Sequence, residues 1–122
     1  MNWNGGRLRD LLTDILTAIE RIDRYTAEID EVAFLSNTLV QDAVVRNLEI
    51  IGEASRNIDR KFPEFATAHP DLPFAYAYQM RNALAHGYGK VDFEIVWRTI
   101  QNDLPDLHRR LREAVAGLEP GS

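Results

Sequence analysis

The 122-residue sequence predicts an all-α protein, an up-down bundle of four main helices with one extra short helical turn. Apolar residues recur at steps of three and four in four long segments, which is the spacing of one helix face. No segment alternates apolar and polar residues with the period of two that strands require. The length suits one domain, so we expect a single domain over residues 1–122 with a core from about residue 7 to residue 118.

The first helix is expected over residues 7–25. One apolar stripe runs along it and consists of Leu8, Leu11, Leu12, Ile15, Leu16, Ile19 and Ile22. The next segment, residues 26–37, is a connector that contains the extra helical turn near residues 30–35.

The second helix is predicted from Thr38 to Ile58, because Thr38 and Gln41 have the spacing of a capping box. Gly52 lies in its interior at a cost of roughly 1 kcal/mol relative to alanine. We expect this glycine to permit the close approach of another helix.

The third helix follows a segment with three prolines, residues 61–73, which we expect to be an ordered loop that tucks Phe62 and Phe65 against the core. Pro73 can open this helix, which then runs over about residues 74–86. Gly87 is suited to end it.

The fourth helix is capped by Asp92 and keeps one apolar face as far as Leu118. Pro105 falls inside this run, and the apolar phase continues past it. We therefore expect a kink at Pro105 rather than two unrelated helices.

Composition narrows the class of protein. Hydrophobic residues make up 45% of the chain and charged residues 27%, as in an ordinary globular protein. The absence of cysteine excludes disulfides and thiolate metal sites. No apolar run approaches the ~20 residues that span a bilayer, and the N-terminus lacks an apolar signal region, so we expect a cytoplasmic protein without a membrane partner. The net charge of -5 argues against a broad electrostatic grip on nucleic acid but permits a small cationic cleft.

The octet RNALAHGY at residues 81–88 contains the residues best suited to chemistry. Arg81 can stabilise charge that develops on a phosphate, and His86 can move a proton near neutral pH. Asn82 can orient the imidazole or donate to phosphate. These groups would suffice to cleave RNA without a metal or other cofactor, with His86 as general base on a ribose 2′-hydroxyl or general acid on the leaving oxygen.

Helix geometry limits how these residues can act together. At about 100° per residue, Arg81 and Tyr88 share a face, Asn82 and His86 share another, and Arg81 and His86 lie about 140° apart. Convergence on one ligand then requires the helix to unwind at Gly87, or a second copy of the chain across a two-fold axis. The spacing of Arg81 and His86 does not by itself distinguish a catalytic pair from two ordinary surface residues.

The octet resembles the arginine, four-spacer, histidine, spacer, tyrosine motif of the HEPN superfamily. Residues 7–12, 41–54 and 91–97 resemble the HepT-like branch of that superfamily, so the resemblance covers nearly the whole chain. It implies a HEPN-like helical fold, a homodimer, and a toxin of a toxin–antitoxin pair that cleaves RNA without metal at the dimer cleft.

The same resemblance implies a partner and an off-switch. The antitoxin partner would be a minimal nucleotidyltransferase of the MntA type, which transfers AMP to the motif tyrosine, here Tyr88. Arg81 and His86 would be the ribonuclease residues, with Asn82 in support. AMP on Tyr88 would block the cleft by bulk and charge.

Other polar residues have two readings each. Arg46, Glu49 and Glu53 follow a spacing of three and then four, which fits either a polar wall facing the cleft, with Arg46 and Glu53 positioning Arg81, or a solvated face with an ion pair. The basic segment 108–112 fits contact with RNA or a partner, and better a charged outer face. His69, His86 and His108 lack ligand-like spacing, so no metal site is expected.

The sequence leaves two alternatives to a ribonuclease. One is a non-catalytic helical module that docks the nucleotidyltransferase or a nucleotide. The other is a purely structural helical bundle, for which Arg81 and His86 would be replaceable.

Overall fold

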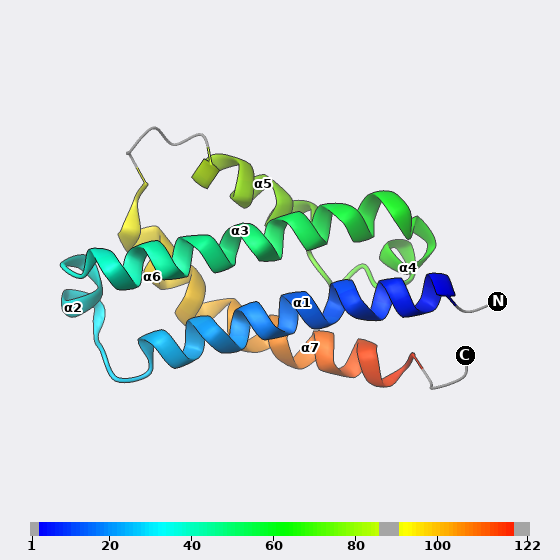
Figure 1. Cartoon of the computed structure of the whole chain (residues 1–122), viewed down its shortest axis with the longest axis horizontal. Helices are drawn as coiled ribbons and strands as arrows, with labels where there is room; N and C mark the ends of the chain where they lie inside the picture. The colour runs from blue at the N-terminus through cyan, green and yellow to red at the C-terminus, as the bar shows by residue number, and fades with distance from the viewer. Residues whose placement is uncertain (1–2, 86–90, 119–122) are drawn as a thin grey trace.

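The computed structural model describes residues 3–85 and 91–118. Within these ranges the chain forms helices and no strands, which confirms the all-α class (Figure 1). The helices are α1 (Trp3–Thr26), α2 (Glu31–Leu35), α3 (Thr38–Lys61), α4 (Pro63–Ala68), α5 (Phe74–Ala85), α6 (Phe93–Asn102) and α7 (Leu104–Ala116).

The two long helices α1 and α3 lie side by side and antiparallel (Figure 1). Helix α5 packs on the other side of α3, and α7 packs along α1. Helix α6 continues into α7 and reaches α2. A groove of about 330 Å³ lies beside α5, with Met80 from α5 and Leu104 and Leu107 from α7 in its walls.

Helices α3, α5 and α6 start where predicted, whereas α1 starts earlier. Helix α1 begins at Trp3, four positions before the expected Arg7. Helix α2 is the predicted extra turn, and the Asp30 side chain accepts a hydrogen bond from the Ala33 N–H at 2.9 Å. That bond satisfies one of the donors left free at a helix N-terminus.

The capping box expected at the start of α3 is wrong. The cap is Asn37, whose Oδ1 accepts from the Val40 N–H at 3.1 Å, so Thr38 is already inside the helix. Gln41 turns away from the cap, because its buried amide Nε2 donates to the Phe34 carbonyl at 2.9 Å. This bond joins α3 to α2.

The proline-rich segment contains a helix where a loop was expected. Helix α4 starts at Pro63, a residue that fits a first helical turn because its missing N–H would have no partner there. Phe62 and Phe65 pack against the core as predicted. The Phe65 ring also stacks on His69 at 4.2 Å between ring centroids.

The predicted fourth helix is divided at one residue, Asp103, into α6 and α7. Asp103 keeps helical angles of φ −99° and ψ −38°. Pro105 explains the break, because it has no N–H to donate to the Gln101 carbonyl one turn earlier. Asp92 caps α6 as expected, since its Oδ1 accepts from the Glu94 N–H at 3.0 Å.

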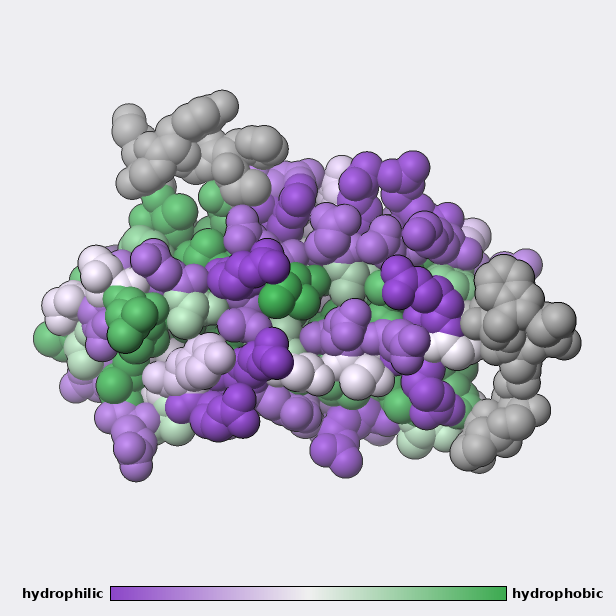
Figure 2. Space-filling view, in the orientation of Figure 1, coloured by the Kyte–Doolittle hydropathy of each residue, from purple (hydrophilic) through white to green (hydrophobic). Residues whose placement is uncertain are grey.

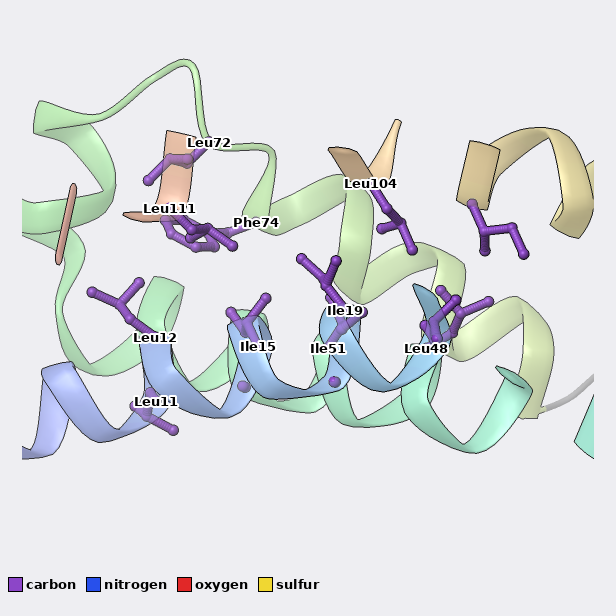
Figure 3. Close-up of a cluster of buried hydrophobic side chains, with 14 of the residues drawn as sticks. Leu11, Leu12, Ile15, Ile19, Leu48, Ile51, Leu72, Phe74, Leu104 and Leu111 are labelled. Atoms are coloured by element: carbon purple, nitrogen blue, oxygen red, sulfur yellow. The ribbon is translucent and has the colours of Figure 1, made fainter. Parts of the chain in front are cut away.

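The core lies between the long helices and the segments that cover them. In Figure 3, Leu12, Ile15 and Ile19 of α1 point toward Phe74, Leu104 and Leu111. The side chains of Leu12 and Leu111 are completely buried. Full burial of one such side chain contributes about 1.5–3 kcal/mol, so this layer fixes α1 against α7 and the start of α5.

No helix in the described part of the chain combines the length and the apolar character needed to cross a membrane.

Candidate functional site

Gly52 and Arg81 bring α3 and α5 into close contact. A Cβ placed on Gly52 would lie 2.8 Å from the Arg81 Cγ and 2.9 Å from the Ala77 carbonyl oxygen, and closer still to the Arg81 Cβ. No side chain fits in that space. Gly52 therefore serves the predicted purpose, the close approach of another helix, and it fixes where the Arg81 side chain leaves α5.

The Arg81 guanidinium is held from two sides. Its Nη1 donates to the Asn82 Oδ1 at 3.0 Å, and its Nη2 lies 3.5 Å from the Glu53 Oε2. The Arg81 side chain is one-third exposed. A guanidinium has five N–H donors in a fixed plane, so donors remain for a ligand such as a phosphate.

A polar groove of about 450 Å³ adjoins Arg81 between α1 and α3. Arg46 and Glu53, the predicted cleft-wall residues, both line it. The remaining lining residues are Arg7, Leu11, Asp14, Glu49, Ile50, Ala54 and Asn57. Among the described residues no ion pair joins Arg46 to Glu49, whereas Glu53 pairs with Arg81. Arg46 and Glu53 thus lie on one groove with Arg81, and their role as a cleft wall stays a prediction.

Two motif residues, His86 and Tyr88, lie outside the described residues. The angular relations of His86 with Asn82 and of Tyr88 with Arg81 therefore stay predictions. Arg81 and Asn82 are both described, and a hydrogen bond joins their side chains.

Sequence reasoning missed three groove residues, Arg7, Asp14 and Asn57. Arg7 and Asp14 are separated by seven positions on α1 and lie off its apolar stripe, so they share one polar face. The sequence alone could have predicted this polar face of α1. It could not have predicted that the face lies beside α3 and Arg81, because that position depends on how α1 and α3 are aligned.

The other histidines and the basic segment serve the surrounding structure. His108 Nε2 lies 2.8 Å from Glu20 Oε2. Within the described ranges, no three side chains of the types that bind metals come together.

Residues 108–112 form a network of ion pairs with nearby carboxylates. Arg109 pairs with Asp106 and Glu113, and Arg110 pairs with Asp106 and Asp71. The hydrogen bond from Arg109 lowers the pKa of Asp106 below its ordinary value. The same pairing raises the pKa of Arg109. These pairs fit the expected charged outer face.

The fold and the groove together place this chain in a class of protein: small all-α proteins in which a partly exposed arginine lies at the edge of a polar groove. The family described as "Ribonuclease HepT-like" matches residues 15–114. The chain belongs to this HepT-like ribonuclease family, which confirms the resemblance drawn from its motifs.

Individual relatives agree with the family match. "Probable ribonuclease HepT" of Thermococcus cleftensis is 43% identical over 99 residues, which are 81% of this chain and 87% of that protein. "Putative RNase MJ1380" of Methanocaldococcus jannaschii is 34% identical over 104 residues, 85% of this chain and 93% of that protein. "Putative RNase TTE0752" of Caldanaerobacter subterraneus is 33% identical over 106 residues, 87% of this chain and 88% of that protein. No solved structure matches the chain at a significant level.

Proposed function

We propose that this protein is a metal-independent endoribonuclease that works as a homodimer, with one catalytic domain over residues 1–122. Arg81 and His86 are its catalytic residues and Asn82 supports them. The single observation that carries the proposal is the setting of Arg81. It projects over Gly52, is held by Asn82 and Glu53, and borders a polar groove in a chain of the HepT-like ribonuclease family. The relatives' names, which describe RNases, support the reaction class.

The reaction needs a base, an acid and a cation. A base removes the proton of the ribose 2′-hydroxyl, and the resulting oxygen attacks the adjacent phosphorus. An acid protonates the departing 5′-oxygen, which leaves a cyclic phosphate on one product and a 5′-hydroxyl on the other. His86 from each protomer supplies one of these proton transfers. The Arg81 guanidinium stabilises the extra negative charge on the phosphoryl oxygens between the two transfers.

Glu53 is suited to hold Arg81 without blocking it. The pair is partly exposed and its closest atoms are 3.5 Å apart, so it is worth about 0–1 kcal/mol. A phosphate can displace a carboxylate held this weakly, because a charge-assisted bond to phosphate uses the same N–H groups. Glu53 and Asn82 therefore orient the guanidinium in the free protein and yield to the substrate.

The proposal extends to a cytoplasmic toxin–antitoxin pair. An MntA-like minimal nucleotidyltransferase would be the antitoxin and would transfer AMP to Tyr88. The adenylylated tyrosine would add a negative phosphate and a nucleoside near the catalytic groups, which opposes the entry of RNA by charge and by bulk. No metal or other cofactor of this chain takes part.

The test is RNA cleavage by the purified, unmodified protein beside Arg81→Ala and His86→Ala. Both variants should lose nearly all activity, whereas Arg112→Ala, which removes an exposed arginine of α7, should retain it. Equal cleavage by all four proteins would reject the catalytic assignment. It would favour the alternative of a non-catalytic module that docks the nucleotidyltransferase.

The off-switch has a separate test. Incubation with the partner enzyme and ATP should add the mass of one or more AMP units to the chain and abolish cleavage. Tyr88→Phe should gain no mass and remain active. Full inhibition of Tyr88→Phe under the same conditions would contradict tyrosine modification as the switch.

A further inference from the structure

A second polar feature lies one helical turn from Arg81 on the contact line between α3 and α5. The guanidinium carbon of Arg56 on α3 stands 5.5 Å from the centre of the Tyr78 ring on α5. These residues border a hollow of about 480 Å³ that is also lined by Asp59, Arg60, Ala75 and Gln79. We call this hollow the Arg56–Tyr78 site.

The Arg56–Tyr78 site is in line with Arg81. Helices α3 and α5 run antiparallel, and two observed pairs fix their alignment: Glu53 with Arg81, and Arg56 with Tyr78. Each partner moves by three residues between the two pairs, a rise of about 4.5 Å along the helix. Arg60 lies a further turn along α3. Arg81, Arg56 and Arg60 thus follow one another along the contact of α3 with α5, at axial steps of about 4.5 Å and 6 Å.

The charge along this line differs from that of the whole chain. Residues 46–61 and 74–85 contain five lysines and arginines against three carboxylates, whereas the chain carries a net charge of -5. Hydrophilic side chains cover the C-terminal half of α3 in Figure 2. The local excess of positive charge is small, which fits a short stretch of phosphates rather than a long duplex.

From this arrangement we infer that the Arg56–Tyr78 site binds the RNA strand beside the cleavage site. Arg56 and Arg60 contact flanking phosphates, and the Tyr78 ring supports one base. The inference rests on the proposed ribonuclease function. Proteins that bind single strands combine cations that follow the backbone with aromatic rings that stack on bases, and both kinds of group are present here.

The contacts that Arg56 and Tyr78 make with each other do not prevent this role. Arg56 and Tyr78 are both partly buried, and a cation–π pair is worth about 0.5–1 kcal/mol when exposed and about 2 kcal/mol when desolvated. A base stacked on an aromatic ring is worth about 1–3 kcal/mol, so RNA can compete for the ring or stack on the Arg56–Tyr78 pair as a unit. Asp59 is the one carboxylate in the lining of the hollow, where two arginines outnumber it.

The experiment measures binding rather than cleavage. The probe is a single-stranded RNA with 2′-O-methyl ribose at each position, whose blocked 2′-oxygen cannot attack the phosphate, so that the strand cannot be cut. Its dissociation constant is measured over a range of salt concentrations for the full chain and its variants. The variants are Arg56→Ala with Arg60→Ala, Tyr78→Leu and Tyr78→Phe, and the control is Arg112→Ala, which removes one positive charge on α7.

The two kinds of contact predict different signatures. Loss of both arginines should weaken binding by about tenfold for each charge-assisted contact. It should also flatten the plot of log K against log salt by about 1.4, since each phosphate contact on a single strand contributes about 0.7. Tyr78→Leu should weaken binding by about tenfold with the slope unchanged, because stacking releases no counterions. Tyr78→Phe and Arg112→Ala should bind like the wild type.

Equal affinities and slopes for the double arginine variant, the Tyr78 variants and the Arg112 control would overturn the inference and leave the site as a protein contact or a structural pair. Circular dichroism melting of every variant separates lost binding from lost folding. A wild type that binds the probe through Arg56 and Arg60 but never cuts ordinary RNA would refute the proposed function and still support the binding site.

Discussion

Gly52→Ala should impair catalysis far more than stability. A methyl group at this position collides with the Cβ and Cγ of Arg81 and with the Ala77 carbonyl oxygen at 2.9 Å, and two of these atoms are fixed to the backbone of α5. Ordinary contact begins at 3.4 Å, so α5 must move away from α3. The Arg81 Cβ lies closest, and we expect a displacement on the order of 1 Å, enough to cost about 100-fold in rate when a catalytic group moves with it.

The effect on stability is the difference between two opposing terms. Alanine in place of glycine in a helix interior stabilises by roughly 0.5–1 kcal/mol. Forcing an extra methyl group into a packed contact costs about 1–3 kcal/mol. The free energy of unfolding should therefore fall by about 0–2.5 kcal/mol, and the variant should remain folded at room temperature.

Gly6→Ala is the matched control, because Gly6 also lies in a helix and its added Cβ would meet no atom within 4 Å. That substitution should raise stability by the propensity term alone and leave cleavage unchanged. The assays are urea unfolding for both variants and initial rates of RNA cleavage at saturating substrate. If Gly52→Ala were stabilised as much as Gly6→Ala and retained full activity, the close contact between α3 and α5 would not be what positions Arg81.

Three further outcomes are expected. Glu53→Gln removes the negative charge beside Arg81, so KM for RNA should fall by about two- to threefold because phosphate is repelled less. The kcat should also fall, because the guanidinium is less well oriented. An unchanged KM and kcat would mean that Glu53 does not act on Arg81. Asn37→Ala should cost about 1 kcal/mol in unfolding free energy and Thr38→Ala much less, since Asn37 is the cap; the reverse order would restore Thr38 as the cap. In Arg109→Ala, the pKa of Asp106, followed by NMR titration, should rise toward its ordinary value, because the larger of its two hydrogen-bond contributions is lost while Arg110 remains. With a pKa lowered in the folded state, Asp106 favours folding above its ordinary pKa, and that contribution disappears as the pH falls through the lowered value; the variant should therefore lose less stability on acidification than the wild type.

The long helices were predictable because their apolar stripes are properties of local sequence. The periodicity located α1 and α3, and the fourth apolar run was correct in phase even though Pro105 divides it. Errors arose where short segments or distant partners decide the outcome. Helix α4 has six residues, too few for a period to show, and its prolines suggested a loop. Helix α3 starts at Thr38 as predicted, but its cap is Asn37, and Gln41 bonds to Phe34 across the connector instead of completing a capping box.

The candidate site was predictable in its parts but not in its assembly. Arg81 and Asn82 were identified as candidate site residues from their side-chain chemistry. Gly52 was identified as a close-contact position because a glycine in a helix interior lowers stability and so needs a reason. The contact of Glu53 with Arg81 joins residues that are far apart in sequence, so it depends on how α5 is aligned on α3. The same is true of Arg7 and Asp14, which reach the groove only through the packing of α1. His86 and Tyr88 stay predictions from the sequence.

The attachment of α5 has a consequence for how the protein loses activity when heated. Helix α5 rests mainly on α3, and the groove bordered by Met80, Leu104 and Leu107 leaves its other flank loosely covered. Such an element can separate at a lower free energy than the pair of long helices beneath it. On heating, catalytic activity should then be lost at a lower temperature than the helical circular dichroism signal. A sample that still has its full helical signal can already be inactive, and it should recover its activity on cooling.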